Sequence, residues 1–178
     1  ILAMESTRLG KCLEGAVTLL KSQADKSSWT TPDGAFYGTG EPKGSLAFLF
    51  PGQGSQYVGM LRDLACQFPE LLDSLDRLNR LNEAGRQLSD VIYPHPAFDD
   101  ETKEAQERAL RATEVAQPAI GAVSVGALGV LQRFGLEPAA VAGHSYGELV
   151  ALQAAEVFDA QTLSVLSMLR GRLMSEGN

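Results

Sequence analysis

The stretch Gly143-His144-Ser145-Tyr146-Gly147 constrains the fold of this chain more than any other feature. Apolar residues lead up to it, and the apolar spacing that follows it is helical. This layout predicts a strand, a tight turn and a helix, with Ser145 at the apex in a strained conformation and its hydroxyl exposed. Gly143 and Gly147 are needed because side chains there would collide where strand and helix nearly touch. The pattern indicates a nucleophilic serine; the alternative is an ordinary glycine-rich loop.

The composition of the 178 residues is that of a soluble globular domain, with 44% hydrophobic and 21% charged residues. The net charge of -7 argues against nucleic acid as a partner, since a phosphate-binding face needs clustered Lys and Arg. Cys12 and Cys66 lie in helix-like patterns and are predicted to be buried free thiols. The cysteines have no spacing typical of a metal site, so no metal is expected.

The sequence also predicts a cytoplasmic protein. Its apolar runs stay below the ~18 residues of a membrane span, and its N-terminus lacks the basic flank and long apolar stretch of a signal peptide. Because Ile1 is not an initiator Met, we expect the chain to be cut from a longer polypeptide.

The N-terminal part is predicted to be a helix followed by a linker. Residues 3–25 show helical spacing, whereas residues 27–44 are rich in Ser, Thr, Gly and Pro and show no period. These later residues are typical of a linker or a wrapped loop. Their aromatic side chains, Trp29, Phe36 and Tyr37, are expected to pack against the neighbouring domain.

The apolar run Ser45–Phe50 predicts a strand buried on both faces of a parallel sheet. The glycine-rich turn Gly52-Gln53-Gly54-Ser55-Gln56 follows it, at the strand end where α/β sheets place ligand contacts. This turn lacks the Lys and Ser/Thr of a phosphate loop. Its backbone N–H groups are nevertheless able to receive developing negative charge.

Helical spacing recurs along the rest of the chain. The segments concerned are 57–64, 69–81, a turn near 88–92, 99–111 as a solvated helix or loop, 117–134 and 159–173. Pro118 is expected in the first turn of its helix, Gly135 as the C-terminal cap of that helix, and Asp159 as the N-cap of the last. The order of strand, helices, strand and helix predicts an α/β fold with a parallel sheet.

Two motifs together resemble the acyl/malonyl transferase family of fatty-acid and polyketide synthesis. They are Phe48-Leu49-Phe50-Pro51-Gly52-Gln53-Gly54-Ser55-Gln56 and Gly143-His144-Ser145-Tyr146-Gly147-Glu148. The segments GHSYGELVAL and LRGRLM are similar to the corresponding sequences in transferases of iterative polyketide and polyunsaturated-fatty-acid synthases. The resemblance implies an α/β-hydrolase-like core over residues 45–178, the N-terminal part of the large subdomain. Residues 1–44 resemble the linker that precedes this domain in multidomain synthases.

The resemblance also implies roles for individual residues. Ser145 would take the acyl group from coenzyme A as an ester and pass it to the phosphopantetheine thiol of an acyl carrier protein, with no bound cofactor. The backbone N–H groups of Gln53 and Tyr146 would form the oxyanion hole, which agrees with their places at two strand ends.

Three further residues are assigned to substrate binding. Arg170 stands where the family has the arginine that holds the carboxylate of a malonyl group, and a guanidinium grips a carboxylate through two hydrogen bonds. A surface arginine near a helix end is the alternative. Gln117 matches a family glutamine near the site. His144 is expected to pack or to hydrogen-bond beneath the elbow, because adjacent side chains at a strand end point to opposite faces. Glu156 departs from the small residue of many members.

The serine needs a base, usually a histidine, and the chain has only His95 and His144. Neither histidine is expected to act as the base for Ser145. The resemblance places the catalytic histidine, the substrate-sorting motif and a ferredoxin-like subdomain after Asn178. A partial domain of this kind is expected to expose a large apolar surface where its other half packs. The alternatives to a transferase are an acyl-thioester hydrolase that uses the same serine, and a non-catalytic docking module of a synthase.

Overall fold

The computed structural model describes residues 6–40, 44–81 and 87–177. The chain divides into two compact units, residues 1–44 and residues 45–178. Residues 3–5 of the first predicted helix lie outside the described residues.

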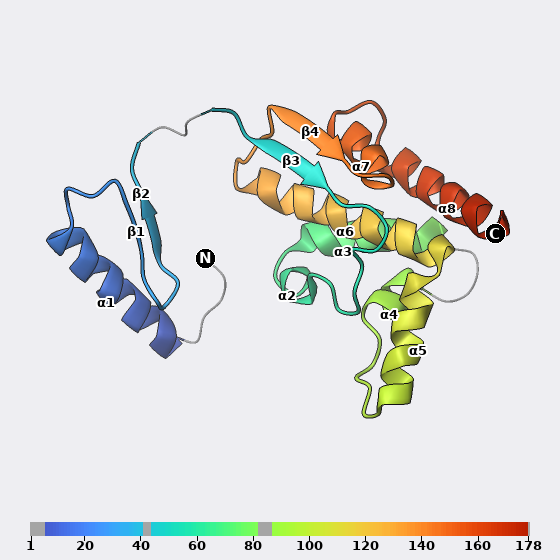
Figure 1. Ribbon diagram of the computed structural model, residues 1–178, viewed down its shortest axis with the longest axis horizontal. Coiled ribbons are helices and arrows are strands. Elements are labelled where there is room, and N and C mark those ends of the chain that lie inside the picture. Colours follow the sequence, from blue (N-terminus) through green and yellow to red (C-terminus); the bar gives the residue numbers. More distant parts are fainter. Residues whose placement is uncertain (1–5, 41–43, 82–86, 178) are drawn as a thin grey trace. The chain divides into compact units, whose positions relative to one another are not determined.

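The first unit contains a helix, α1 (Ser6–Ser22), and an antiparallel hairpin of β1 (Ser28–Thr30) and β2 (Phe36–Gly38) (Figure 1). The expectation of a loop without secondary structure is therefore wrong for this segment. Trp29 pairs with Tyr37 across the hairpin, and their rings stack with centroids 5.0 Å apart. This cross-strand stacking holds two strands that are too short to show a sequence period.

Only part of the predicted apolar face of α1 is covered. Cys12 is buried, as predicted, whereas Leu13, Val17 and Leu20 are exposed. Phe36 of the hairpin is also exposed, at 81%. The described residues of this unit thus leave apolar side chains in solvent.

The second unit is built on a parallel pair of strands, β3 (Ala47–Phe50) and β4 (Ala140–Gly143) (Figure 1). The register places Phe48 opposite Val141, and both pack against the core beneath the sheet. The predicted α/β class with a parallel sheet is confirmed. Burial on both faces is wrong: Leu49, on the opposite face, is 79% exposed, because the helices described in this unit pack on the side of Phe48.

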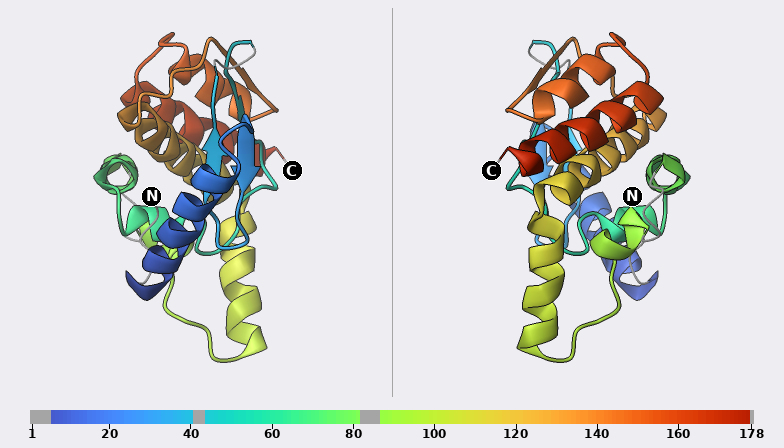
Figure 2. Two further views of the ribbon diagram at one scale, coloured as in Figure 1. Left: turned by 90° about the vertical axis from the view of Figure 1, so that its left-hand side faces the viewer. Right: turned by 90° about the vertical axis from the view of Figure 1, so that its right-hand side faces the viewer.

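The central element of this unit is α6 (Thr113–Arg133), which contacts α3 (Pro69–Leu81) and α8 (Ala160–Glu176) along its length. Both views of Figure 2 show α8 lying alongside α6. The helix begins four residues before the predicted start, so Pro118 lies in its second turn and not its first. The proline was a misleading start signal, because it is also tolerated inside a helix at the cost of one hydrogen bond.

The helix α6 is long and apolar. Its most apolar window of 18 residues has a mean hydropathy of 1.4, enough by length and composition for a membrane span. Its apolar surface is taken up by the core of the unit, with 61% of the most apolar window buried. It is a core helix of the second unit.

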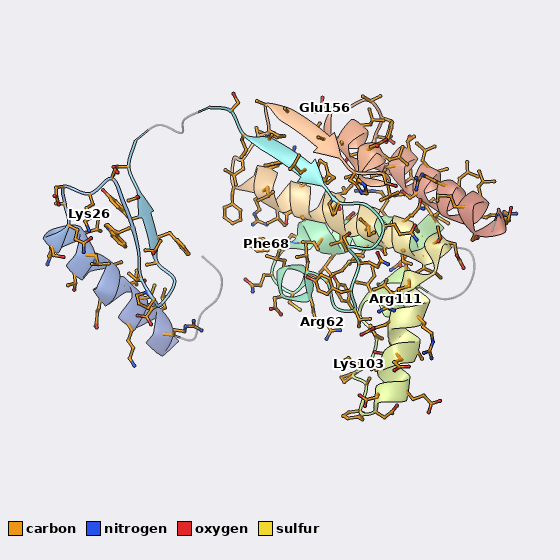
Figure 3. All side chains as sticks on the ribbon, viewed as in Figure 1. Lys26, Arg62, Phe68, Lys103, Arg111 and Glu156 are labelled. Atoms are coloured by element: carbon orange, nitrogen blue, oxygen red, sulfur yellow. The ribbon has the colours of Figure 1, made fainter. Side chains whose placement is uncertain are left out.

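The remaining helices are α2 (Arg62–Ala65), α4 (Leu88–Ile92), α5 (Asp100–Arg111) and α7 (Gly147–Ala154). The charged segment is thus a helix, and Lys103 and Arg111 project from it (Figure 3). The helix predicted over residues 57–64 is reduced to turns followed by α2. Cys66, the C-cap of α2, is exposed and not buried as predicted; the four-residue α2 buries Ala65 instead.

Two predicted helix caps are confirmed, Gly135 at the C-terminal end of α6 and Asp159 at the N-terminal end of α8. Gly135 follows α6 with a φ of 73°, and Leu136 N–H donates to the Leu131 carbonyl, which gives the hydrogen-bond pattern of a glycine-terminated helix. At the start of α8, the carboxylate of Asp159 accepts from the backbone N–H of Thr162 at 2.7 Å.

Candidate active site

Ser145 lies at the apex of a tight turn between β4 and α7. Its φ is 53°, a left-handed conformation that is unfavourable for residues other than glycine, and the residue is exposed. A Cβ on Gly143 would overlap the backbone of Gly147, and a Cβ on Gly147 would overlap the carbonyl of Phe50. The predicted steric role of both glycines is therefore confirmed. The turn holds the serine hydroxyl outside the strand–helix contact.

The turn after β3 lies directly beside this elbow. The backbone N–H of His144 donates to the Phe50 carbonyl at 3.1 Å, and a Cβ on Gly52 would meet the backbone and imidazole of His144. Gln53 is the next residue of that turn. In the described part of the chain, the backbone N–H groups of Gln53 and Tyr146 donate no hydrogen bond. Both donors are thus available to a ligand.

A chain of side-chain hydrogen bonds joins three of the predicted residues. Arg170 donates to the side-chain oxygen of Gln117 at 2.7 Å, and the Gln117 amide nitrogen donates to the side-chain oxygen of Gln53 at 3.1 Å. Gln53 in turn donates to the Thr113 hydroxyl at 3.1 Å. The structure therefore brings together the turn after β3, the first turns of α6 and the last turns of α8.

The burial of Gln117 fixes this arrangement. The residue has no exposed surface, and a buried amide that loses its partners is costly. Its nitrogen also lies 3.3 Å from the Met174 sulfur. With oxygen and nitrogen both engaged, its amide has one orientation, which holds the guanidinium of Arg170 in place.

The charge of Arg170 is unbalanced within the described residues. It is half-buried and has no carboxylate within 4.0 Å there, whereas Arg172, two residues on, pairs with Glu176 at 2.7 Å. A half-buried guanidinium with one neutral partner retains N–H donors for an anion.

The side chain of Tyr146 was missed by the sequence analysis, which used only its backbone N–H. It is fully buried, and its hydroxyl lies 2.5 Å from the Ser167 hydroxyl on α8. Burial raises the pKa of Tyr146 to about 12, while the Ser167 hydrogen bond and the charge of Arg170 act in the opposite direction. A polar residue on α8 one turn before Arg170 was the available signal for this pair.

The two histidines of the chain occupy different parts of the second unit. His144 is exposed beside Gly52, so the expectation that it lies beneath the elbow is wrong; the close approach of the Gly52 backbone leaves its ring at the surface. His95 lies between α4 and α5, where its carbonyl accepts from Gln106 at 2.9 Å. Neither histidine hydrogen-bonds to Ser145 in the part of the chain that the structure describes.

Two other features complete the surroundings. The described residues contain no group of three His, Cys, Asp or Glu side chains that could hold a metal ion. Glu156 lies after α7 with a φ of 58° and is exposed (Figure 3). Within the described residues its side chain forms no hydrogen bond or ion pair with the residues of the elbow.

Comparison with known proteins identifies the family of this chain. The model of the acyl transferase domain family matches residues 47–178. The chain belongs to this family. Acyl transferase relatives include the phenolphthiocerol synthesis polyketide synthase type I Pks15/1 of Mycobacterium marinum, 39% identical over 135 residues. That alignment covers 74% of this chain and 6% of the synthase.

Solved acyl transferases have the same fold as the second unit. The acyl carrier protein S-malonyltransferase of Vibrio cholerae is 38% identical, with a TM-score of 0.64, over 76% of this chain and 40% of the enzyme. A malonyl-transacylase solved in complex with a type II polyketide synthase acyl-carrier protein is 37% identical, with a TM-score of 0.65, over the same shares. This acyl transferase chain thus spans about two fifths of the solved enzymes that it matches.

Proposed function

We propose that this chain contributes the nucleophile and the carboxylate-binding group to the transfer of a malonyl-type acyl group. The donor is a coenzyme A thioester, and the acceptor is the phosphopantetheine thiol of an acyl carrier protein. Membership of the acyl transferase family supports the reaction class. A related malonyl-transacylase forms a complex with an acyl-carrier protein, which supports the partner. The observation that carries the proposal is the hydrogen-bonded series Arg170–Gln117–Gln53 beside the Ser145 elbow.

In the first half-reaction the Ser145 hydroxyl oxygen attacks the thioester carbonyl and loses its proton to a base. The carbonyl oxygen becomes negative and is stabilised by the backbone N–H groups of Gln53 and Tyr146. The carbon–sulfur bond then breaks, the coenzyme A thiolate takes up a proton, and an acyl ester remains on Ser145. One oxyanion donor of this kind typically contributes about 3 kcal/mol of barrier reduction.

In the second half-reaction the base takes the proton of the phosphopantetheine thiol, and the resulting thiolate attacks the Ser145 ester. The same two N–H groups stabilise the negative oxygen, and collapse returns the proton to the serine oxygen and leaves a thioester on the carrier. Since neither His95 nor His144 bonds to Ser145, we place the base outside these 178 residues. The family resemblance favours a histidine from a later part of the same domain.

Arg170 gives the site its preference for acids. Its free N–H donors can bind the terminal carboxylate of malonyl, and the Gln117 oxygen fixes the orientation of the guanidinium. A hydrolase would have no need of this group for simple esters. The arginine therefore favours the transfer of dicarboxylic acyl groups over general ester hydrolysis.

The test follows the acyl group. The full-length protein is incubated with isotopically labelled malonyl-CoA, and the mass of the peptide that contains Ser145 is measured before and after addition of holo acyl carrier protein. A malonyl adduct on Ser145 that moves to the carrier supports the proposal. Rapid release of free malonate without transfer would favour the hydrolase. Absence of any adduct on Ser145 would contradict both reactions and leave the docking module.

A further inference from the structure

The side chain of Tyr146 connects the residue after the nucleophile to the helix that carries Arg170. Its ring lies in the core beneath the elbow with no exposed surface, packed with Phe50, Ile120 and Val150. Its hydroxyl reaches Ser167 on α8 at 2.5 Å. This bond joins side chains from α8 and the start of α7 in a region closed to water.

The direction of the bond follows from counting protons. The Ser167 hydroxyl has one proton and donates it to the Leu163 carbonyl at 2.6 Å. Ser167 therefore accepts from Tyr146, whose hydroxyl must be the donor. The raised pKa of Tyr146, about 12, keeps the phenol protonated across the working range of pH. The Tyr146 hydroxyl therefore remains available as the donor of this bond.

Space for this hydroxyl is provided by a glycine on the third element. A Cβ on Gly121 of α6 would overlap the Tyr146 hydroxyl oxygen and would come within 3.5 Å of the Ser167 hydroxyl. Tyr146 therefore reaches α8 through a gap that only glycine leaves in α6. The contact involves the elbow, α6 and α8 together.

Ser167 and Arg170 are three residues apart on α8, so their side chains lie on one face of the helix. The charge of Arg170 acts on the Tyr146 hydroxyl, which agrees with this neighbourhood. The bond between Ser167 and Tyr146 fixes the translation of α8 along its axis and its rotation about that axis, including at the next turn, where Arg170 lies. The orientation of Arg170 toward Gln117 depends on that setting.

We propose that Tyr146 is a positioning residue, and that its hydroxyl bond to Ser167 fixes α8 so that Arg170 faces the carboxylate of the acyl group on Ser145. Selectivity for carboxylated over uncharged acyl groups then depends on this bond. The inference rests on the proposed function and deepens it, because it assigns part of the substrate preference to a side chain that does not touch the substrate.

The test compares two acyl donors in the full-length protein. Tyr146→Phe keeps the ring and removes the hydroxyl. We expect the malonyl-to-acetyl ratio of kcat/KM for loading to fall about fivefold, as for the loss of one hydrogen bond, since the backbone N–H of residue 146 serves both donors alike. Tyr37→Phe, which removes a hydroxyl from the other unit, is the matched control and keeps the wild-type ratio of the two donors.

A second variant approaches the same bond from α8. Ser167→Ala is expected to lower the malonyl-to-acetyl ratio as Tyr146→Phe does, and the double variant is expected to lower it no further. In an Arg170→Ala background, Tyr146→Phe should leave the ratio unchanged, because there is no guanidinium left to position. If the bond had a merely structural role, its loss would instead lower kcat/KM for loading from both acyl donors by the same factor in every background.

The outcomes separate this inference from the proposed function. If the wild-type protein loads malonyl on Ser145 but Tyr146→Phe and Ser167→Ala keep its donor ratio, the positioning role is refuted and the transfer reaction stands. An equal loss for both donors, or a ratio change that persists without Arg170, also refutes it. If the wild-type protein loads neither donor, the proposed function fails and the inference fails with it.

Discussion

The guanidinium of Arg170 donates a 2.7 Å hydrogen bond to the side-chain oxygen of Gln117, a residue with no exposed surface. This contact joins α8 to α6 and engages one of the N–H donors of the arginine. The Gln117 amide nitrogen donates in turn to the side-chain oxygen of Gln53, the residue whose backbone N–H is proposed to bind the oxyanion. The group proposed to bind the carboxylate and a residue proposed for the oxyanion hole are thus parts of one hydrogen-bonded unit.

Replacing Arg170 with alanine tests the charge directly. We expect Arg170→Ala to lower kcat/KM for malonyl loading by about 2 kcal/mol or more in barrier height, which is about 30-fold, because an ion pair with the substrate is lost. Loading from acetyl-CoA should change little. The control is Arg172→Ala, which removes an exposed guanidinium paired with Glu176. An equal loss for both donors in Arg170→Ala would remove the arginine from carboxylate binding.

Gln117→Glu tests whether the neutrality of the amide matters. A carboxylate at this position would form an ion pair with Arg170 and compete with the substrate carboxylate, at nearly unchanged volume. We expect KM for malonyl-CoA to rise about tenfold, equivalent to about 1.4 kcal/mol. Gln132→Glu, an exposed site on the same helix, is the control. Unchanged malonyl kinetics in Gln117→Glu would contradict the role of Gln117 in orienting the arginine.

Gly121→Ala tests the space reserved for the Tyr146 hydroxyl. Alanine would favour the helix by about 1 kcal/mol but places a Cβ onto the hydroxyl oxygen, so we expect net destabilisation. Tyr146→Phe removes that oxygen, and Gly121→Ala should then be much better tolerated. Thermal unfolding of the single and double variants measures this coupling. Additive changes in Tm would contradict it.

The elbow is predictable from the sequence because its geometry is local. Gly143 and Gly147 are required by backbone atoms within a few residues of Ser145, and a short window of sequence contains them all. The caps at Gly135 and Asp159 are local in the same sense. Such features need no knowledge of how distant elements pack.

The Tyr146–Ser167 bond and the outer face of β3 depend on packing between distant elements. Ser167 meets Tyr146 because α8 crosses α6 closely, at a point where a Cβ on Gly171 would touch the backbone of Glu114. The spacing of apolar residues in the sequence does not predict where these two helices cross. Leu49 likewise has the pattern of a buried residue, but its exposure is decided by which elements cover the sheet.

The hairpin in the first unit was missed although a signal was present. Pro32-Asp33-Gly34 is a strong turn sequence between two short segments that both contain aromatic residues. Gly34 has a φ of 92°, which the turn requires. The strands on either side have three residues each, too few for a period to outweigh the Ser and Thr content.

The left-handed backbone conformation of Ser145 is expected to lower the stability of the folded protein, and the free energy of unfolding measures this cost. At a φ of 53° a residue with a Cβ costs about 1 kcal/mol, so we expect Ser145→Gly to be more stable than Ser145→Ala by about that amount. Both variants should lose the acyl ester. Urea denaturation gives the difference. At Ser124, inside α6, the order should reverse, with alanine more stable than glycine. The same order at both sites would contradict strain at the elbow.

The N-cap of α8 is expected to make stability depend on pH. The backbone N–H of Thr162, followed by its hydroxyl, lowers the pKa of Asp159 from the ordinary value of 3.8. The ionised cap therefore stabilises the folded state at pH values above 3.8, and this contribution is lost as pH falls through the lower folded pKa. We expect Asp159→Ala to lower Tm at pH 7, with a deficit that shrinks in acid. Asp159→Asn keeps an oxygen acceptor and should show a smaller deficit at pH 7. A deficit for Asp159→Ala that stays constant down to pH values below the folded pKa would contradict a charged cap.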